Sequence, residues 1–215
     1  MRVRCVLACI TVLFQASYAS ADLVGISKEE FLPHYAKQKD PLWCWAASTQ
    51  MILSYQGAKV PQEEVVLRVK GALSSSAGSI AEMIAAANGV FSSSGKEVVV
   101  SGQYVHGAPL ATVLYNQLSH KRPVILNYIA SGSNIGHAVV VTAIDASISN
   151  GELMVSGLYV FDPFSYRVVQ EWGVIKYIHD QGLITKYYPL SALGGTLYLP
   201  AGAITGVVLV DGTAL

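Results

Sequence analysis

Cysteine is scarce in this chain, which has three in 215 residues, too few and too scattered for a disulfide framework or a zinc site. An excess of either charge is also lacking, because 14 Lys and Arg balance 14 Asp and Glu. There is no cluster of basic residues, which argues against a nucleic-acid partner. Outside the N-terminal segment, no apolar run reaches the roughly 18 residues of a membrane helix. We therefore expect no metal, no other cofactor, no nucleic acid and no stable membrane span.

The N-terminus shows the order of features of a secretory signal. Arg2 and Arg4 are basic, residues 6–14 form a short apolar run, and Ala19-Ser20-Ala21 is a small-x-small cleavage site. This order predicts a signal peptide over residues 1–21, with a hydrophobic helix of the mature protein as the alternative. The remaining length suits one domain over residues 22–215. The predicted location is therefore secreted or periplasmic.

Removal of the signal peptide changes the cysteine count. Cys5 and Cys9 would leave with it, and Cys44 would remain alone. An unpaired thiol in an exported protein has an intermolecular partner, is buried and inert, or is reactive. The inert state is common inside cells, but a free thiol outside them is exposed to oxidation. Cys44 is therefore a candidate nucleophile.

Hydrophobic periodicity and capping residues predict helices in the first half of the mature chain and strands in the second. For example, one helix ends before Gly57, and Ser79-x-x-Glu82 is a capping-box pattern. Helices followed by strands indicate an α+β fold. A further helix is predicted over residues 171–180, although Gly173 disfavours it. The other predicted helices are 43–56, 61–70, 79–88 and 109–119, and the predicted strands are 98–100, 123–130, 138–144, 158–161, 187–188, 196–199 and 204–210.

The segment around Cys44 has features that suit a nucleophile. Pro41 and the periodicity place Cys44 in the first turn of a helix, where free backbone N–H groups and the helix dipole favour an anion such as a thiolate. Gln38 lies six residues earlier, in the loop entering the helix. Its side-chain amide could curl back and, with the Cys44 N–H, provide two donors for an oxyanion. A buried core helix with a cysteine on its apolar face is the alternative explanation.

His137 is the best candidate for a general base among five histidines. It opens the apolar strand that starts at Ala138, after a Gly- and Ser-rich loop, and strand ends are where scaffolds present catalytic groups. A histidine that is merely hydrogen-bonded at a strand end is the alternative. The other four occupy less suitable places: His34 an upstream loop, His106 a Gly-flanked turn, His120 a solvated helix end and His179 a polar surface stretch.

The strand register selects Asp162 as the group that orients His137. Asn150-Gly151 is a hairpin dipeptide between two apolar runs, and pairing across it places Asp162 opposite Val139. Asp162 and His137 would then share a face at a diagonal distance of roughly 5–8 Å. Asp145 is roughly 26 Å along the strand and fails this test. An irregular loop over residues 145–157 is the alternative, which would alter the register.

These motifs resemble those of the papain-like cysteine proteases. Gln38 and the Cys44-Trp45 pair match the Gln-x5-Cys-Trp arrangement of that superfamily. The Trp-Cys-Trp-Ala-Ala-Ser run is similar to a bacterial branch that includes secreted effector proteases and bacteriocin-leader peptidases. The sequences Gly-His-Ala-Val at 136–139 and Val-Phe-Asp-Pro at 160–163 resemble the histidine and aspartate motifs. The resemblance covers residues 38–163 and departs from the plant enzymes, which have Gly-Ser between the glutamine and the Cys-Trp pair.

The resemblance implies a secreted bacterial cysteine peptidase of papain-like α+β fold. In this fold an N-terminal helical half, with Cys44 at a helix N-terminus, packs on an antiparallel sheet that carries His137 and Asp162. Cys44 would be the nucleophile, His137 the base, Asp162 its orienting group and Gln38 an oxyanion donor. The expected partner is a protein or peptide substrate, and a proteinaceous inhibitor or immunity partner is a further candidate. An amidase or acyltransferase acting on cell-wall peptides, or an inactive peptide-binding module, are the alternatives.

Overall fold

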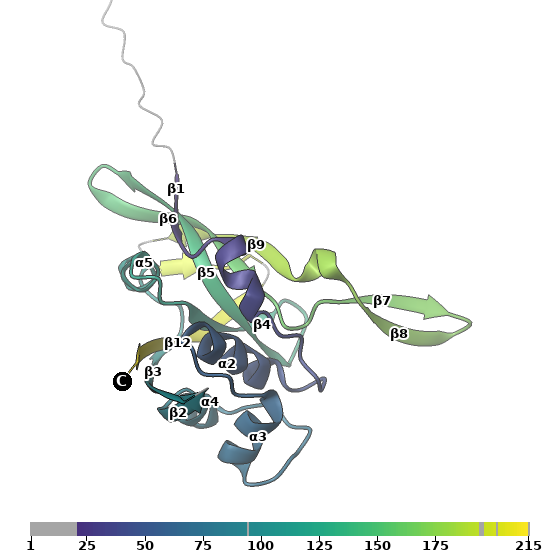
Figure 1. Ribbon diagram of the computed structural model, residues 1–215. Helices are drawn as coiled ribbons and strands as arrows, with labels where there is room; N and C mark the ends of the chain where they lie inside the picture. Colours follow the sequence, from purple (N-terminus) through teal and green to yellow (C-terminus); the bar gives the residue numbers. More distant parts are fainter. Residues whose placement is uncertain (1–20, 94, 194–195, 201, 215) are drawn as a thin grey trace, which may run out of the picture.

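A large antiparallel sheet forms the centre of the molecule in the computed structural model (Figure 1). The structure describes residues 21–93, 95–193, 196–200 and 202–214, so the predicted signal peptide lies outside them except for Ala21. The strands run in the order β2-β3-β12-β4-β5-β6-β9, and β1 pairs with the far part of β5. Their bounds are β1 Asp22–Gly25, β2 Gly89–Ser93, β3 Lys96–His106, β4 Val124–Ala130, β5 Gly136–Ser149, β6 Glu152–Phe161, β9 Thr185–Pro189 and β12 Gly202–Ala214.

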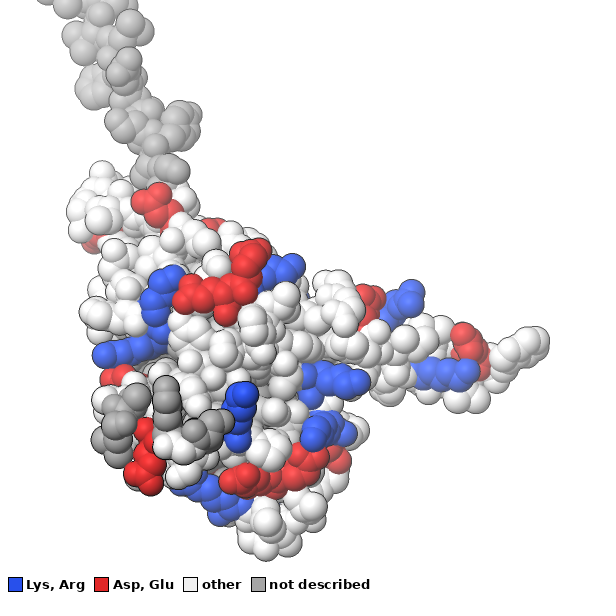
Figure 2. Space-filling model, in the orientation of Figure 1, with Lys and Arg blue, Asp and Glu red and all other residues white. Residues whose placement is uncertain are grey.

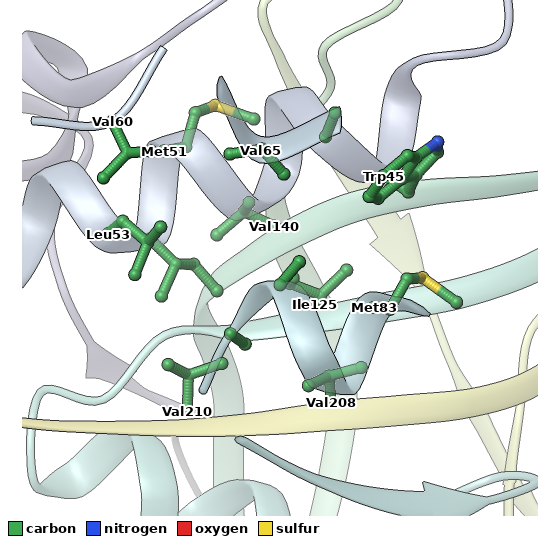
Figure 3. Close-up of a cluster of buried hydrophobic side chains, with 14 of the residues drawn as sticks. Trp45, Met51, Leu53, Val60, Val65, Met83, Ile125, Val140, Val208 and Val210 are labelled. Atoms are coloured by element: carbon green, nitrogen blue, oxygen red, sulfur yellow. The ribbon is translucent and has the colours of Figure 1, made fainter. Parts of the chain in front are cut away.

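Helices cover both faces of this sheet. Successive residues of a strand point to opposite sides, so a strand of consecutive apolar residues places side chains against the helices on each face. Ile125 and Val140 pack in a buried cluster with side chains of α2, α3 and α4 (Figure 3). Leu126 and Val139, their neighbours in sequence, pack in a second cluster that includes α5. The helix bounds are α1 Lys28–Phe31, α2 Cys44–Tyr55, α3 Gln62–Lys70, α4 Ile80–Ala86 and α5 Ala111–Ser119, with short 3-10 turns at Leu32–His34 and Gln181–Leu183.

The predicted helices α2 to α5 are present, although α4 ends at Ala86, two residues before the predicted end. At the start of α4, the Ser79 hydroxyl accepts from the Glu82 N–H, and the Glu82 carboxylate accepts from the Ser79 N–H. At the end of α3, Gly71 has the left-handed conformation of a C-terminal cap, with φ of 72°. Within the described residues, no helix is long and apolar enough to cross a membrane.

The helix predicted over residues 171–180 is wrong. This stretch belongs to a separate hairpin of β7 (Tyr166–Glu171) and β8 (Val174–His179). Trp172 and Gly173 have φ of 53° and 79°, which are the left-handed values of a two-residue hairpin turn. The β-branched and aromatic residues that follow Gly173 favour a strand. A small third sheet pairs β10 (Ser191–Leu193) with β11 (Thr196–Tyr198).

The hairpin of β5 and β6 turns at Asn150-Gly151, as predicted, with φ of 53° and 81°. The alternative of an irregular loop over residues 145–157 is therefore wrong. Followed away from the turn, the pairing of β5 with β6 begins in the predicted register. It shifts by one residue at a bulge at Ser156 of β6 and shifts back at a second bulge at Thr142 of β5. The two bulges offset each other, so Val140 pairs with Phe161, and Asp162 is the residue that follows the end of β6.

Candidate active site

Cys44 is the first residue of α2, at the end of a loop that Asp40 stabilises. The Asp40 carboxylate accepts from the Leu42 N–H at 2.8 Å, and its backbone carbonyl accepts from the Trp43 N–H at 3.1 Å. The backbone N–H of Cys44, as that of a first helical residue, has no acceptor within its own helix. The loop therefore presents the thiol and a free N–H group at the positive end of the helix dipole.

The tryptophans on either side of Cys44 have a packing role. Trp43 and Trp45 are buried, and their ring N–H groups donate to the carbonyls of Ser74 and Ser76 at 2.8 and 3.2 Å. Cys44 between them is only partly buried. The rings hold the segment after α3 against the start of α2 and leave the sulfur accessible.

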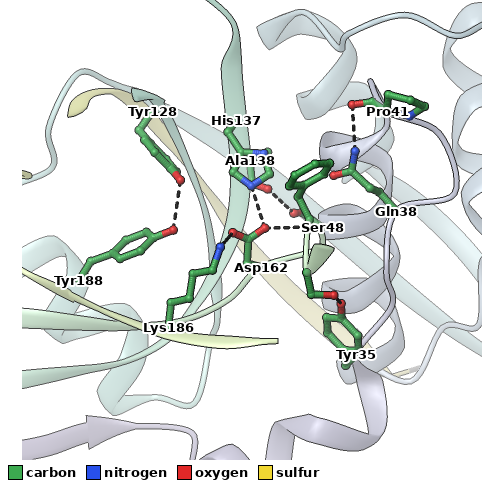
Figure 4. Close-up of polar contacts among 12 residues, drawn as sticks. Tyr35, Gln38, Pro41, Ser48, Tyr128, His137, Ala138, Asp162, Lys186 and Tyr188 are labelled. Carbon is green, nitrogen blue, oxygen red and sulfur yellow. Dashed lines mark hydrogen bonds and ion pairs between the residues drawn. The ribbon is translucent and has the colours of Figure 1, made fainter. Parts of the chain in front are cut away.

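His137 and Asp162 are in direct contact (Figure 4). His137 Nε2 lies 2.8 Å from Asp162 Oδ1, and the Asp162 side chain is only 2% exposed. His137 is the second residue of β5, and the Ser48 hydroxyl of α2 donates to the neighbouring carbonyl of Ala138 at 3.1 Å. This bond ties the start of β5 to α2. With Nε2 held by the carboxylate, Nδ1 is the ring nitrogen left for Cys44.

Asp162 accepts from two further donors that the sequence analysis did not identify. The Phe164 N–H donates to Oδ1 at 2.7 Å, and the Lys186 ammonium lies 2.5 Å from Oδ2. Lys186 is on β9, directly opposite Val160 of β6. Sequence reasoning predicted a strand only at 187–188 and had no signal for which strand it would pair with.

The pKa values of the pair reflect these contacts. Burial is the largest influence on His137 and lowers its pKa, but hydrogen bonds and charge from Asp162 and Cys44 outweigh it and raise the pKa from 6.5 to about 9. Burial raises the pKa of Asp162, yet His137 and Lys186 together hold it below its ordinary value. At neutral pH the imidazole is therefore protonated and the carboxylate is ionised.

Aromatic rings enclose the histidine. The Tyr128 ring, directly across the ladder, meets the His137 ring edge-on at 5.7 Å, and the Phe164 ring does so at 6.4 Å. The Tyr128 hydroxyl lies 3.1 Å from that of Tyr188. Burial, the main cause, and the Asp162 charge raise the pKa of both phenols, so they stay neutral. The Tyr128 and Phe164 rings cover part of the imidazole, whose side chain is 22% exposed.

Gln38 lies at the site, but its amide is engaged with the backbone. Its side chain is buried, and Nε2 donates to the carbonyls of Asp40 and Pro41, both at 2.9 Å (Figure 4). Among the described residues, the buried Oε1 atom has no hydrogen-bond partner. Gln38 lines a cavity together with Cys44. Its two amide hydrogens are directed at the loop and not at the sulfur side.

Two cavities meet at the cysteine and the histidine. Both include Cys44, Ala77, Gly136 and His137 in their walls. One, of about 340 Å³, extends past Gly78, Met83, Tyr104, His106 and Asn127. The other, of about 370 Å³, extends past Gln38, Leu42, Tyr128, Phe164 and Lys186. Cys44 and His137 thus lie between two spaces, and an extended chain could pass the sulfur on both sides.

The remaining histidines have other partners. His34 bonds to the Ser54 hydroxyl at 2.9 Å, and exposed His120 bonds to the Asn116 carbonyl at 2.7 Å. His179 is not simply on the surface, because it bonds to the buried Ser165 hydroxyl at 2.9 Å. The turn predicted for His106 is also wrong, because this residue ends β3. In the described part of the chain, no three His, Cys, Asp or Glu side chains gather as metal ligands would.

A cysteine at a helix N-terminus, set against an antiparallel sheet with a histidine–aspartate pair, is the arrangement of the papain-like cysteine protease superfamily. The model of the Peptidase C39-like family matches residues 32–190, and the chain belongs to this family. The matched range includes both cavities' main walls, the β7–β8 hairpin and Lys186. A comparison with curated proteins found no match.

Proposed function

We propose that the chain is a cysteine peptidase that hydrolyses peptide bonds through Cys44, His137 and Asp162. The observation that carries the proposal is the meeting of three features: Cys44 at the start of α2, the 2.8 Å contact between His137 and Asp162, and the cavities on both sides. Membership of the Peptidase C39-like family suggests the same class of reaction.

In the resting state, the thiol proton is held on His137. The raised pKa of His137 supports this imidazolium, and the helix N-terminus stabilises the thiolate. The thiolate attacks the substrate carbonyl carbon, and the carbonyl π electrons move to the oxygen. The tetrahedral intermediate then expels the amine, which takes the proton from His137 and leaves a thioester on Cys44.

Water completes the cycle. Neutral His137 takes a proton from a water molecule, and the resulting hydroxide attacks the thioester carbonyl. The acid product leaves, and the thiolate–imidazolium pair is restored. Asp162 does not exchange protons in this scheme, because Lys186 and His137 keep its pKa low. It orients the ring so that Nδ1 faces the sulfur.

The oxyanion needs two donors. The free Cys44 N–H is one of them. Gln38 would provide the second if one of its amide hydrogens moved from a backbone carbonyl, Asp40 or Pro41, to the substrate oxygen. The cost of that exchange is small because a charge-assisted hydrogen bond replaces a neutral one.

Export belongs to the same proposal. Residues 1–21 would act as a bacterial signal peptide, and the peptidase would work in the periplasm or outside the cell. Pairing of β1 with β5 begins at Asp22, so cleavage after Ala21 would leave every pair of that ladder intact.

The proposal is tested with the chain that starts at Asp22, in which Cys44 is the only cysteine. A peptide library is digested with this chain and with Cys44→Ala, and the cleaved bonds are identified by mass spectrometry. We expect the variant to lose more than ~10⁴-fold of the activity while its circular dichroism and melting temperature are unchanged. Cleavage by Cys44→Ala at the native rate would refute the nucleophile.

Thiol labelling provides a second test that needs no substrate. Iodoacetamide should alkylate Cys44 rapidly at neutral pH, and the rate should fall in His137→Ala, which lacks the cation that stabilises the thiolate. Ser54→Ala, which removes the partner of another histidine, His34, is the matched control and should label as the native chain does. Equal labelling of His137→Ala and the native chain would contradict the ion pair.

A further inference from the structure

The hairpin of β7 and β8 projects from the body as an arm, defined here as residues 164–180 (Figures 1 and 2). Figure 2 shows its surface to be largely uncharged, with a few charged side chains between. Val168, Ile175 and Tyr177 are 56%, 60% and 60% exposed. A two-stranded hairpin alone is marginally stable in water, and a run of exposed apolar side chains marks a binding surface.

The two faces of the arm differ in charge. The strand register places one set of side chains on each face, since alternate residues point the same way. The charged face holds Arg167, Val169, Glu171, Val174, Lys176 and Ile178. The uncharged face holds Tyr166, Val168, Gln170, Ile175, Tyr177 and His179, with no Asp, Glu, Lys or Arg.

The uncharged face is continuous with the active site through Phe164. The Phe164 ring contacts the His137 ring at 6.4 Å and lines the cavity that contains Cys44. The same ring packs against Tyr166 at 5.3 Å and against Tyr177 at 6.0 Å. An apolar strip therefore runs from the histidine, over Phe164, onto this face of the arm.

The base of the arm is fastened to the loop that carries Gln38. The Gln38 N–H donates to the Pro163 carbonyl at 3.0 Å, and the Tyr166 hydroxyl donates to the Gln38 carbonyl at 3.2 Å. At the same level, the buried Ser165 hydroxyl bonds to Tyr35 and to His179. These bonds fix the direction of the arm relative to the cysteine and the histidine.

We propose that the uncharged face of the arm binds an extended, uncharged and apolar segment of the protein substrate beside the bond to be cut. The inference rests on the proposed peptidase function and adds the substrate class to it. Strands of six residues span about 20 Å, which corresponds to about six residues of extended substrate. Within the described residues each strand of the arm has one edge with no neighbouring strand, so the segment can pair by its backbone while its apolar side chains contact this face.

Binding is measured separately from catalysis, in the Cys44→Ala chain. The probe is a fluorescein-labelled twelve-residue peptide in which valine and leucine alternate with serine and glutamine, and the comparison peptide has glutamate at the apolar positions. We expect fluorescence anisotropy to show at least about tenfold tighter binding of the apolar peptide. Ile175→Ser with Tyr177→Ser, on the uncharged face, should remove that difference. Val174→Ser, equally exposed but on the charged face, should leave it unchanged.

Several results would overturn the inference. These are equal binding of the two peptides, unchanged binding by the Ile175→Ser/Tyr177→Ser chain, or an equal loss in Val174→Ser. Two other results would assign the face to another occupant. One is a dimer seen by sedimentation, and the other is adsorption to phosphatidylcholine vesicles, if Ile175→Ser/Tyr177→Ser abolishes the dimer or the adsorption. Because the measurement uses an inactive chain, peptide binding without any hydrolysis by the native chain would reject the peptidase function and keep the binding face.

Discussion

Lys186 and His137 contact opposite oxygens of one buried carboxylate, that of Asp162. The two cations come from different strands, β9 and β5, on either side of β6. Asp162 is thus held from both sides, and the imidazole is oriented by a group that cannot itself rotate away. This relationship leads to the first prediction.

Lys186→Met should raise the pKa of Asp162, because one of the two cations that lower it is lost. The acid limb of the pH profile of kcat/KM should then move to higher pH. Unfolding should become easier by about 1.5–3 kcal/mol, the range for a lost hydrogen bond to a charged group. Lys186→Arg keeps the charge and should restore the native profile. A role limited to packing would lower the melting temperature without moving the acid limb.

The alkaline limb reports on His137. Its pKa in the folded chain is about 9, so the proton that the leaving amine needs is present below that pH and is lost above it. We expect kcat/KM to fall with an apparent pKa of about 9. The stability of the fold changes in the same direction. The raised pKa of His137 stabilises the fold fully below pH 6.5, and this contribution disappears as the pH rises past 9. An alkaline limb that is unchanged in Asp162→Asn would contradict the link between the two residues.

Removing His137 should cost more activity than removing Asp162. His137→Ala loses both the stabilising cation and the acid, whereas Asp162→Ala keeps the imidazole and loses its orientation and the part of its raised pKa that Asp162 provides. From the behaviour of other catalytic triads, the kcat of Asp162→Ala should be about two orders of magnitude higher than that of His137→Ala. Asp162→Ala also leaves Lys186 without its anion, so stopped-flow kinetics should be paired with thermal unfolding to separate the two effects. Equal kcat for His137→Ala and the native chain would rule out His137 as the base.

The role of Gln38 as an oxyanion donor can be tested by comparing the effects of its substitution on kcat and on KM. If its amide donates to the oxyanion, Gln38→Ala should lower kcat by ~10²–10³-fold and change KM little. Gln38→Glu fills the same space but provides no donor at neutral pH, and it should be equally slow. Since the amide also bonds to Asp40 and Pro41, both variants should be checked for melting temperature. A loss of stability with native kcat would restrict Gln38 to holding the loop.

The local parts of this structure could be predicted from the sequence. The capping box at Ser79 and the glycine at 71 act within one helical turn, and the Asn150-Gly151 turn sets which residues face each other across β5 and β6. Asp162 could be placed for that reason. Lys186 could not be placed, because its position depends on β9 pairing with β6, a contact that no local pattern encodes.

The helix predicted over residues 171–180 failed for a related reason. Over so short a run, valine, isoleucine and tyrosine at 174–178 are compatible with the hydrophobic period of a helix or of a strand. The turn at Trp172-Gly173 also lacks the asparagine or aspartate that is typical of hairpin turns. The directions of the Gln38 hydrogens were also beyond prediction, since they depend on the exact path of a single loop.

The bulges at Thr142 and Ser156 each leave one residue without a partner across the β5–β6 hairpin, whereas the residues on either side of them are paired. Loss of either bulged residue would therefore keep Val140 opposite Phe161 and Asp162 beside His137, but it would remove a local bend and extra twist from the hairpin. A residue added or lost in the paired stretches has a different effect, because it shifts the register and carries the side chains beyond it to the opposite face of the sheet. Changes in chain length are therefore better tolerated at the two bulges than in the paired stretches that lead to His137 and Asp162.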